Sequence, residues 1–278
     1  MLVALAVGAC RAQTGEPAPP AKTEALAPRT PGPAAPALLA PEVYDATPPS
    51  AEAHAPSPAP SAAPESPSSA PSSVSGKKRR YLVAAMGDSI TDTRHGGGRY
   101  LAFLKEKCPE SRFDSYGKGG DMVNQMRRRF DGDILDTTSD PTKPRYTDVI
   151  VYGGVNDLYS DLTAGRTVAK IEADLSAMYS AARAHGLRVI AVTVSPWGGF
   201  KRYFTDARFA TTEELNRWIL GKGHGGIDVV VDSFPILACG RSLCSELSAP
   251  FQDGLHFGPE GHRRLAEALM KSAFSDCR

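Results

Sequence analysis

YLVAAMGDSIT, residues Tyr81–Thr91, contains the strand and the turn from which the fold can be read outward. Six mostly apolar residues stop at Gly87, which is typical of a short strand buried on both faces of a sheet. Glycine lets the chain turn sharply there, so Ser89 is presented at a strand-to-helix turn with its hydroxyl exposed. A plain helix N-cap is the alternative role for Ser89. The longer motif GDSIT directly after a strand favours the role of nucleophile for Ser89.

Four more short runs rich in β-branched residues follow: Arg112–Tyr116, Asp148–Tyr152, Arg188–Val194 and Ile227–Val231. The segments between them have the apolar period of amphipathic helices. Strands that alternate with helices pair in parallel and are joined by right-handed crossovers. Residues 77–278 are therefore expected to form one α/β domain, a three-layer α/β/α sandwich.

Three helices are clearest in the sequence. One covers Val168–His185, with its apolar residues on one face. A second covers Glu213–Leu220, where Thr211 and Glu214 have the spacing of a capping box. The last covers Pro259–Phe274 and begins with proline, which suits the first helical position.

Polar residues follow the predicted strands at the points where reactive groups gather in α/β sheets. Gly120 follows the second strand and offers an N–H to an oxyanion, or belongs to a flexible loop. Asn156 follows the third strand, as an oxyanion donor or as a helix cap. Near the end, Asp253 stands three residues before His256, so that it can accept from Nδ1–H and leave Nε2 free as a base. A metal-binding pair is the alternative, but no further ligands cluster nearby, so no metal is expected.

These motifs, GDSIT, the glycine loop, GGVND and DGLH, resemble the four blocks of the SGNH (GDSL) hydrolase family, in the family's order. The resemblance runs from about Arg80 to Ala273. It implies a flavodoxin-like parallel sheet of five strands in the order 2-1-3-4-5. Many members have Ser-Gly where this chain has Gly119-Gly120, and the resemblance assigns the oxyanion glycine to Gly120.

The resemblance also implies a serine esterase that works without metal or cofactor. Ser89 would attack a carboxylic ester, His256 would move the proton, and Asp253 would hold the imidazole. The N–H groups of Ser89 and Gly120 and the amide of Asn156 would form the oxyanion hole. A non-catalytic glycan-binding lipoprotein and an acyltransferase on the same fold are the alternatives.

The substrate is less defined by the sequence. The aromatic stretch Ser195–Phe204 follows the fourth strand and is expected to form a wall near the site. Its rings would stack on a sugar, line an acyl pocket or pack over the edge of the sheet. Without a long hydrophobic lid in the sequence, a short acyl group such as acetyl, carried by a small ester or a glycan, is the expected substrate. A monomer is expected.

Residues 1–10 and 11–76 differ in composition from the rest. The apolar start ends in Val7-Gly8-Ala9-Cys10, which resembles a bacterial lipoprotein signal and implies lipidation of Cys10. A positively charged start is missing and the apolar run is short; a start codon further upstream would explain both. A chance apolar start with an incidental cysteine is the alternative.

Residues 11–76 hold 16 of the 23 prolines and are expected to be a disordered linker. A domain on such a tether is expected outside the cytoplasm, on the bacterial envelope. Its membrane contact would then be only through an N-terminal lipid. Net charge is +1, and the basic runs such as Arg127-Arg128-Arg129 are short. That run is expected on the solvated face of a helix, and no nucleic-acid partner is expected.

Four cysteines remain after Cys10, and an even number favours disulfides in an exported protein. Of the three possible connectivities, sequence position favours the one in which Cys239 and Cys244 bracket a short loop. Cys108 and Cys277 then lie at the ends of the first and last helices. The fold implied by the resemblance places those helices on the same sheet face, where Cys108 and Cys277 can meet. Four unpaired buried thiols, or a metal site, are the alternatives.

Overall fold

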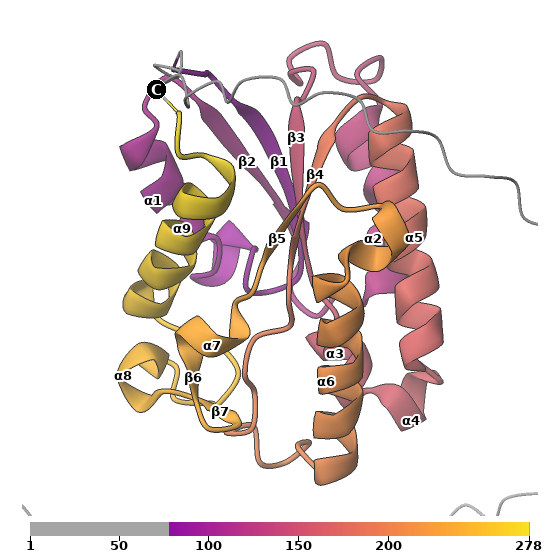
Figure 1. Cartoon of the computed structure of the whole chain (residues 1–278), viewed down its shortest axis with the longest axis vertical. Helices are drawn as coiled ribbons and strands as arrows, with labels where there is room; N and C mark the ends of the chain where they lie inside the picture. Colours follow the sequence, from indigo (N-terminus) through magenta and orange to yellow (C-terminus); the bar gives the residue numbers. More distant parts are fainter. Residues whose placement is uncertain (1–77, 278) are drawn as a thin grey trace, which may run out of the picture. The chain divides into compact units, whose positions relative to one another are not determined.

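The computed structural model describes residues 78–277 of the chain (Figure 1). The expected signal segment 1–10, with Cys10, and the expected linker 11–76 lie outside the described residues. In the part of the chain that is described, no helix is both long and apolar enough to cross a bilayer.

The central sheet has five parallel strands in the order β2-β1-β3-β4-β5. The strands are β1 (Leu82–Gly87), β2 (Arg112–Gly117), β3 (Asp148–Tyr152), β4 (Arg188–Val192) and β5 (Val229–Val231). This order confirms the flavodoxin-like topology that the motifs implied. In the register of the sheet, Gly87 pairs with Gly117 on one side and with Tyr152 on the other. The ends of β1, β2 and β3 are therefore level, and the segments that follow them meet at one edge.

Helices cover both faces of this sheet, so the expected three-layer sandwich is confirmed (Figure 1). One face carries α2 (Val123–Phe130), α5 (Val168–Ala184) and α6 (Asp206–Leu220), and the other carries α1 (Arg99–Lys107) and α9 (Pro259–Ala273). Alternate residues of β1 enter the two cores: Ala84 packs on the first face and Val83 on the second. Because both faces are buried, the strand reads as a continuous apolar run.

Shorter elements complete the chain between these helices and strands. They are η1 (Thr93–His95), the π-helical turn η2 (Asp131–Leu135), α3 (Val155–Tyr159), α4 (Asp161–Ala164), η3 (Lys222–Gly225), α7 (Phe234–Leu237), the hairpin β6 (Ala238–Cys239) and β7 (Ser242–Leu243), and α8 (Ser245–Ser248). Of these, α3 follows β3 directly and therefore begins at the edge where the strand ends meet.

The expected start of α6 is wrong by seven residues. The helix begins at Asp206, and its N-cap is Thr205, whose side chain accepts from the N–H of Arg208. Thr211, expected to cap the helix, lies inside it and donates from Oγ1 to the carbonyl of Arg208 at 2.9 Å. Serine and threonine can bond back to a carbonyl one turn earlier, so a threonine before an apolar run is not by itself a helix start.

The strand β4 ends at Val192, two residues earlier than expected. The backbone of Val194 is held instead by the side chain of Asn216, which accepts from its N–H at 2.7 Å and donates to its carbonyl at 2.9 Å. A side-chain amide has thus replaced the neighbouring strand as the hydrogen-bond partner, and the ladder stops there.

Two disulfides join the four described cysteines in the favoured pairing. Cys108 bonds to Cys277, which links the end of α1 to the residues after α9, and these helices pack side by side (Figure 1). Cys239 bonds to Cys244 and closes the loop of the β6–β7 hairpin. The alternatives of four free thiols or a cysteine metal site are therefore wrong for this structure.

Candidate active site

Ser89 lies in a tight turn immediately after β1. The N–H of Asp92 donates to the carbonyl of Asp88 at 2.9 Å and closes one helical turn around Ser89. A Cβ on Gly87 would lie 2.4 Å from Thr91 Oγ1, so only glycine fits before this turn. The next helical element is η1, and its N-cap is Asp92, so Ser89 does not cap it. The alternative role of Ser89 as a helix cap is therefore wrong.

Three predicted residues form one hydrogen-bonded chain. Ser89 Oγ lies 2.7 Å from Nε2 of His256. Nδ1 of His256 lies 2.6 Å from Oδ2 of Asp253. The other carboxylate oxygen of Asp253 accepts from the backbone N–H groups of Leu255 and His256, at 2.9 and 2.8 Å. The carboxylate thus holds Nδ1 as the N–H donor and leaves Nε2 as the acceptor for the serine hydroxyl.

Asp253 is kept ionised by its surroundings. Partial burial raises its pKa, but hydrogen bonds from the His256 side chain and from two backbone N–H groups lower it further, so the pKa lies below its ordinary value. The loop that carries it is packed tightly, because a Cβ on Gly254 would lie 2.0 Å from the carbonyl carbon of Gly199. The loop after β4, which contains Gly199, therefore packs directly against the loop that carries Asp253 and His256.

The glycine loop after β2 lies beside Ser89, as expected. A Cβ on Gly119 would be 3.9 Å from the Cβ of Ser89. The N–H of Gly119 donates to Asp92 Oδ2 at 3.0 Å, so this amide is occupied. Gly120 has a φ of +81°, which favours glycine, and its own N–H has no hydrogen-bond partner among residues 78–277. Of the two glycines, Gly120 is the better placed to donate to a substrate.

Asn156 lies at the start of α3, but it does not cap the helix, because the N-cap is Gly154. Its side chain is almost fully buried, and Nδ2 donates to the carbonyl of Asp121 at 2.8 Å. A side-chain amide has two hydrogens, so one remains beyond the bond to Asp121. Asn156 thereby also fixes the residue that follows Gly120.

Asp92 is a site residue that the sequence did not reveal. Its buried carboxylate receives two bonds from the Arg94 guanidinium, at 2.8 and 2.7 Å, and one from the N–H of Gly119. These bonds, chiefly that from Arg94, hold its pKa well below the ordinary value. Its position three residues after Ser89, in GDSITD, was the available signal.

Asp157, the last residue of GGVND, organises the helix that follows the glycine loop. Its buried carboxylate accepts from the N–H of Val123, the first residue of α2, at 2.8 Å. It also accepts from Nε of Arg166 at 2.6 Å, and Arg166 bonds Asp174 in turn. The motif therefore supplies both the amide of Asn156 and an anchor for α2.

Arg129 corrects the expectation for the basic run. Arg127 and Arg128 are exposed, but only 13% of the Arg129 side chain is. Its guanidinium faces inward and bonds Asp121 and the carbonyl of Gly87. The expectation of a solvated face is therefore wrong for Arg129. Three consecutive residues of a helix point in different directions, and in α2 the third of these arginines points toward the end of β1.

A cavity of about 290 Å³ opens beside the Ser89 hydroxyl. Ser89, His256 and Gly119 of the glycine loop line this cavity. The other lining residues are Ile90, Gly96, Gly97, Phe251, Phe257 and His262. His262 is buried against the ring of Phe257, with centroids 4.6 Å apart, and its Nδ1 has no hydrogen-bond partner in the described part of the chain. Burial, followed by the charges of Arg99 and His256, lowers its pKa to about 3. The cavity wall is therefore uncharged at this position at neutral pH.

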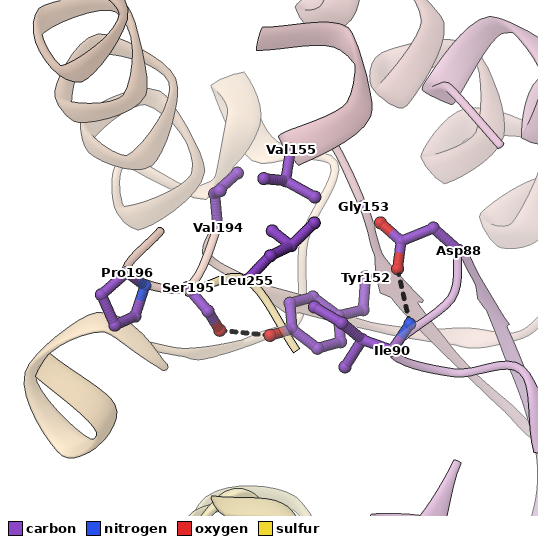
Figure 2. A pocket seen from close by; sticks show the side chains of 9 residues that line it. All are labelled: Asp88, Ile90, Tyr152, Gly153, Val155, Val194, Ser195, Pro196 and Leu255. Carbon is purple, nitrogen blue, oxygen red and sulfur yellow. Dashed lines mark hydrogen bonds between the residues drawn. The ribbon is translucent and has the colours of Figure 1, made fainter. Parts of the chain in front are cut away.

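A second, much smaller hollow lies behind the turn, and Figure 2 shows the side chains around it. Asp88 Oδ1 accepts there from the N–H of Ile90 at 2.9 Å, and Tyr152 hydrogen-bonds Ser195. Burial raises the pKa of Asp88 to about 7, although the bond from Ile90 and the charge of His256 act in the opposite direction.

The titration of Asp88 predicts a specific pH dependence of stability. In the unfolded chain an aspartate ionises near pH 4, but the folded chain holds this proton up to about pH 7. Stability therefore falls as pH rises through that window. Asp88→Asn keeps the acceptor for Ile90 and cannot ionise. We expect the Tm advantage of this variant over wild type to grow between pH 5 and pH 8.5 by roughly 2–8 °C, for a gain of about 1–2 kcal/mol.

Thermal unfolding across pH 5–9 checks this expectation. The exposed Asp131 supplies a matched control, since Asp131→Asn should keep the wild-type pH profile. Parallel pH profiles of wild type and Asp88→Asn would show that Asp88 is ionised throughout.

The fold and this edge of the sheet define a class, the α/β/α hydrolases that present a serine after the first strand. The chain belongs to the GDSL-like lipase/acylhydrolase family, whose model matches residues 85–264. It is thus an ester-hydrolysing enzyme. No curated protein matches the chain in sequence.

Solved structures of the same fold are distant in sequence. A GDSL-like lipase from Bacteroides thetaiotaomicron has a TM-score of 0.56 at 20% identity, covering 69% of this chain and 86% of its own. A lipolytic protein of the G-D-S-L family from Veillonella parvula has a TM-score of 0.51 at 19% identity, covering 70% and 98%. A catalytic mutant of an acetylxylan esterase from Geobacillus stearothermophilus has a TM-score of 0.57 at 18% identity, covering 73% and 99%. At these identities the likeness concerns the fold.

Proposed function

We propose that this enzyme hydrolyses carboxylic esters through an acyl-enzyme on Ser89. The observation that carries the proposal is the continuous chain from Ser89 Oγ through His256 to Asp253, with links of 2.7 and 2.6 Å. His256 takes the proton as Oγ attacks the carbonyl carbon, and returns it to the leaving alcohol as the ester bond breaks. Water then attacks the acyl-enzyme by the same route and releases the acid.

Charge on the carbonyl oxygen would be met by three donors, the N–H groups of Ser89 and Gly120 and the amide of Asn156. The free N–H of Gly120 and the second amide hydrogen of Asn156 support this role. Each donor of this kind is worth about 3 kcal/mol in the barrier. Structures titled as catalytic mutants of the acetylxylan esterase change an aspartate and a histidine that have the same spacing as Asp253 and His256, which supports the acid–base assignment.

We propose that the acyl group is short, such as acetyl, and that it is carried by a glycan. Three partly exposed rings support a sugar-binding surface next to the site: Tyr159, Phe200 and Tyr203, with centroids 4.9–5.6 Å apart. Tyr159 ends α3, three residues after Asn156. We call these three rings the aromatic cluster. Sugar rings stack well on such faces, and two structural neighbours are named as esterases of acetylated xylan or xylo-oligosaccharides.

We further propose that the enzyme acts outside the cytoplasm, as the lipobox-like Cys10 and the proline-rich segment suggest. The two disulfides, Cys108–Cys277 and Cys239–Cys244, support this location, because such bonds persist in oxidising compartments.

The substrate proposal predicts the activity on a graded set of esters. We expect kcat/KM to fall at least about tenfold from p-nitrophenyl acetate to the laurate ester, and an acetylated oligosaccharide to be deacetylated. Phe200→Ala should lower kcat/KM on the oligosaccharide about 3–10-fold, for the loss of roughly 0.5–1.5 kcal/mol of ring contact. Turnover of p-nitrophenyl acetate should stay at the wild-type level.

Phe103→Ala, which removes a partly buried ring from α1, is the matched control and should change neither substrate selectively. Preference for the long acyl chain would overturn the short-acyl assignment. Equal losses on both substrates in Phe200→Ala would remove the aromatic cluster from sugar binding. Transfer of acetyl to an added alcohol in preference to water would identify an acyltransferase, and absence of both turnover and labelling by a fluorophosphonate would identify a binding module.

A further inference from the structure

Arg129, in the last turn of α2, joins segments that lie on two sides of the active site. Nε donates to Asp121 Oδ2 at 2.7 Å, and one terminal nitrogen donates to Asp133 Oδ2 at 2.7 Å. The other terminal nitrogen donates to the carbonyl of Gly87 at 3.1 Å. Gly87 is the last residue of β1, two residues before Ser89. One guanidinium thus connects the nucleophile's strand to the loop that carries Gly120.

That loop is tethered on both sides of Gly120. Before it, the N–H of Gly119 is held by Asp92 at 3.0 Å. After it, Asp121 is held twice, by Arg129 at the carboxylate and by Asn156 at the carbonyl. Within the described residues, nothing lies within 4 Å of the position of a Cβ on Gly120. The direction of the Gly120 N–H therefore depends on the tethers of its two neighbours rather than on packing.

We propose that Arg129 is a positioning residue for the oxyanion hole. By bonding Gly87 and Asp121 together, it sets the distance between Ser89 Oγ and the Gly120 N–H. This inference rests on the proposed function, because it needs Gly120 to stabilise an oxyanion. A misplacement of about 1 Å in such a site can cost 10²-fold in rate. Arginine suits the role because its planar fork makes several bonds in fixed directions, which lysine cannot reproduce.

The first test is kinetic, with p-nitrophenyl acetate. Arg129→Lys keeps the positive charge but cannot reach Asp121, Asp133 and Gly87 at once. We expect kcat to fall about 10–10²-fold with KM within about threefold of wild type. The rate of fluorophosphonate labelling at Ser89 should fall in parallel, because that reaction also develops charge on an oxygen in the hole. Arg128→Lys, on the exposed neighbour in the same helix, should leave both rates unchanged.

A second comparison separates positioning from helix stability. Asp121 and Asp133 both accept from Arg129 at 2.7 Å, but only Asp121 belongs to the glycine loop. We expect Asp121→Ala to reproduce most of the kcat loss of Arg129→Lys. Asp133→Ala should keep kcat near wild type, even where it lowers the Tm by a similar amount.

A double-mutant cycle tests whether the arginine acts through the loop. Asn156 and Arg129 both hold Asp121, so their losses should not multiply. We expect Arg129→Lys to cost at least threefold less in an Asn156→Ala background than in wild type.

Each step can overturn the inference. Wild-type kcat in Arg129→Lys, fully multiplicative losses in the cycle, or equal kcat losses in Asp121→Ala and Asp133→Ala would each contradict it. Failure of the proposed function has a different signature, namely unchanged turnover in Ser89→Ala. Wild-type turnover that depends on Ser89 but not on Arg129 would reject the positioning role alone.

Discussion

Replacing Ser89 with alanine is expected to reduce kcat for p-nitrophenyl acetate by about 10⁴–10⁶-fold, because among residues 78–277 no other hydroxyl bonds Nε2 of the base. Nε2 of His256 lies 2.7 Å from Ser89 Oγ and would lose the hydroxyl from which it takes a proton. The oxyanion donors would remain, and with them a slow attack by water. The fold should persist, since the substitution removes one hydroxyl from a turn that backbone bonds close.

Three measurements make this expectation decisive. Circular dichroism and thermal unfolding should show a folded variant with a Tm within a few degrees of wild type, as the loss of one hydrogen bond is worth about 1 kcal/mol. A fluorophosphonate should label wild type and not Ser89→Ala. Ser180→Ala, on the exposed face of α5, is the matched control and should keep both turnover and labelling. Turnover or labelling that survives in Ser89→Ala would place the nucleophile elsewhere.

The sequence predicted which strand ends carry the residues that gather at this edge of the sheet, for a physical reason. Ser89, Gly120 and Asn156 each follow a strand, and parallel strands with level ends bring such residues together whatever the intervening segments do. In the structure Gly87 pairs with Gly117 and with Tyr152, so the ends of these three strands are level. Asp253 and His256 were predicted because a separation of three residues places the carboxylate on Nδ1 within a single loop.

Residues that act through tertiary contacts were not predictable in this way. Arg129 stands among three arginines, and only the orientation of α2 over the strand ends turns it inward. Asp92 meets Gly119 where the segments after the neighbouring strands β1 and β2 come together, 27 residues apart in the chain. The start of α6 was misjudged because Thr211 and Glu214 have the spacing of a capping box, whereas the observed N-cap is Thr205. For Arg129 and Asp92, the sequence does not show which distant segment of the chain packs beside the residue.

The second large effect concerns Asn156, whose amide makes two separable contributions. It donates to the carbonyl of Asp121 at 2.8 Å and so fixes the loop of Gly120. Its other hydrogen is proposed to meet the oxyanion directly. Asn156→Ala removes both, and we expect kcat to fall about 10²–10³-fold with little change in KM. An unchanged kcat would remove Asn156 from the oxyanion hole.

The size of the loss tells the two contributions apart. Arg129→Lys disturbs the same loop but leaves the amide in place, so a purely positioning Asn156 would cost no more than the 10–10²-fold expected for the arginine. A direct donor should cost about tenfold more than that. Asn156→Asp should be slower still than Asn156→Ala, because a carboxylate cannot donate and repels developing negative charge. If alanine and aspartate at this position gave equal kcat values above that of Arg129→Lys, the amide would act on the loop and not on the oxyanion.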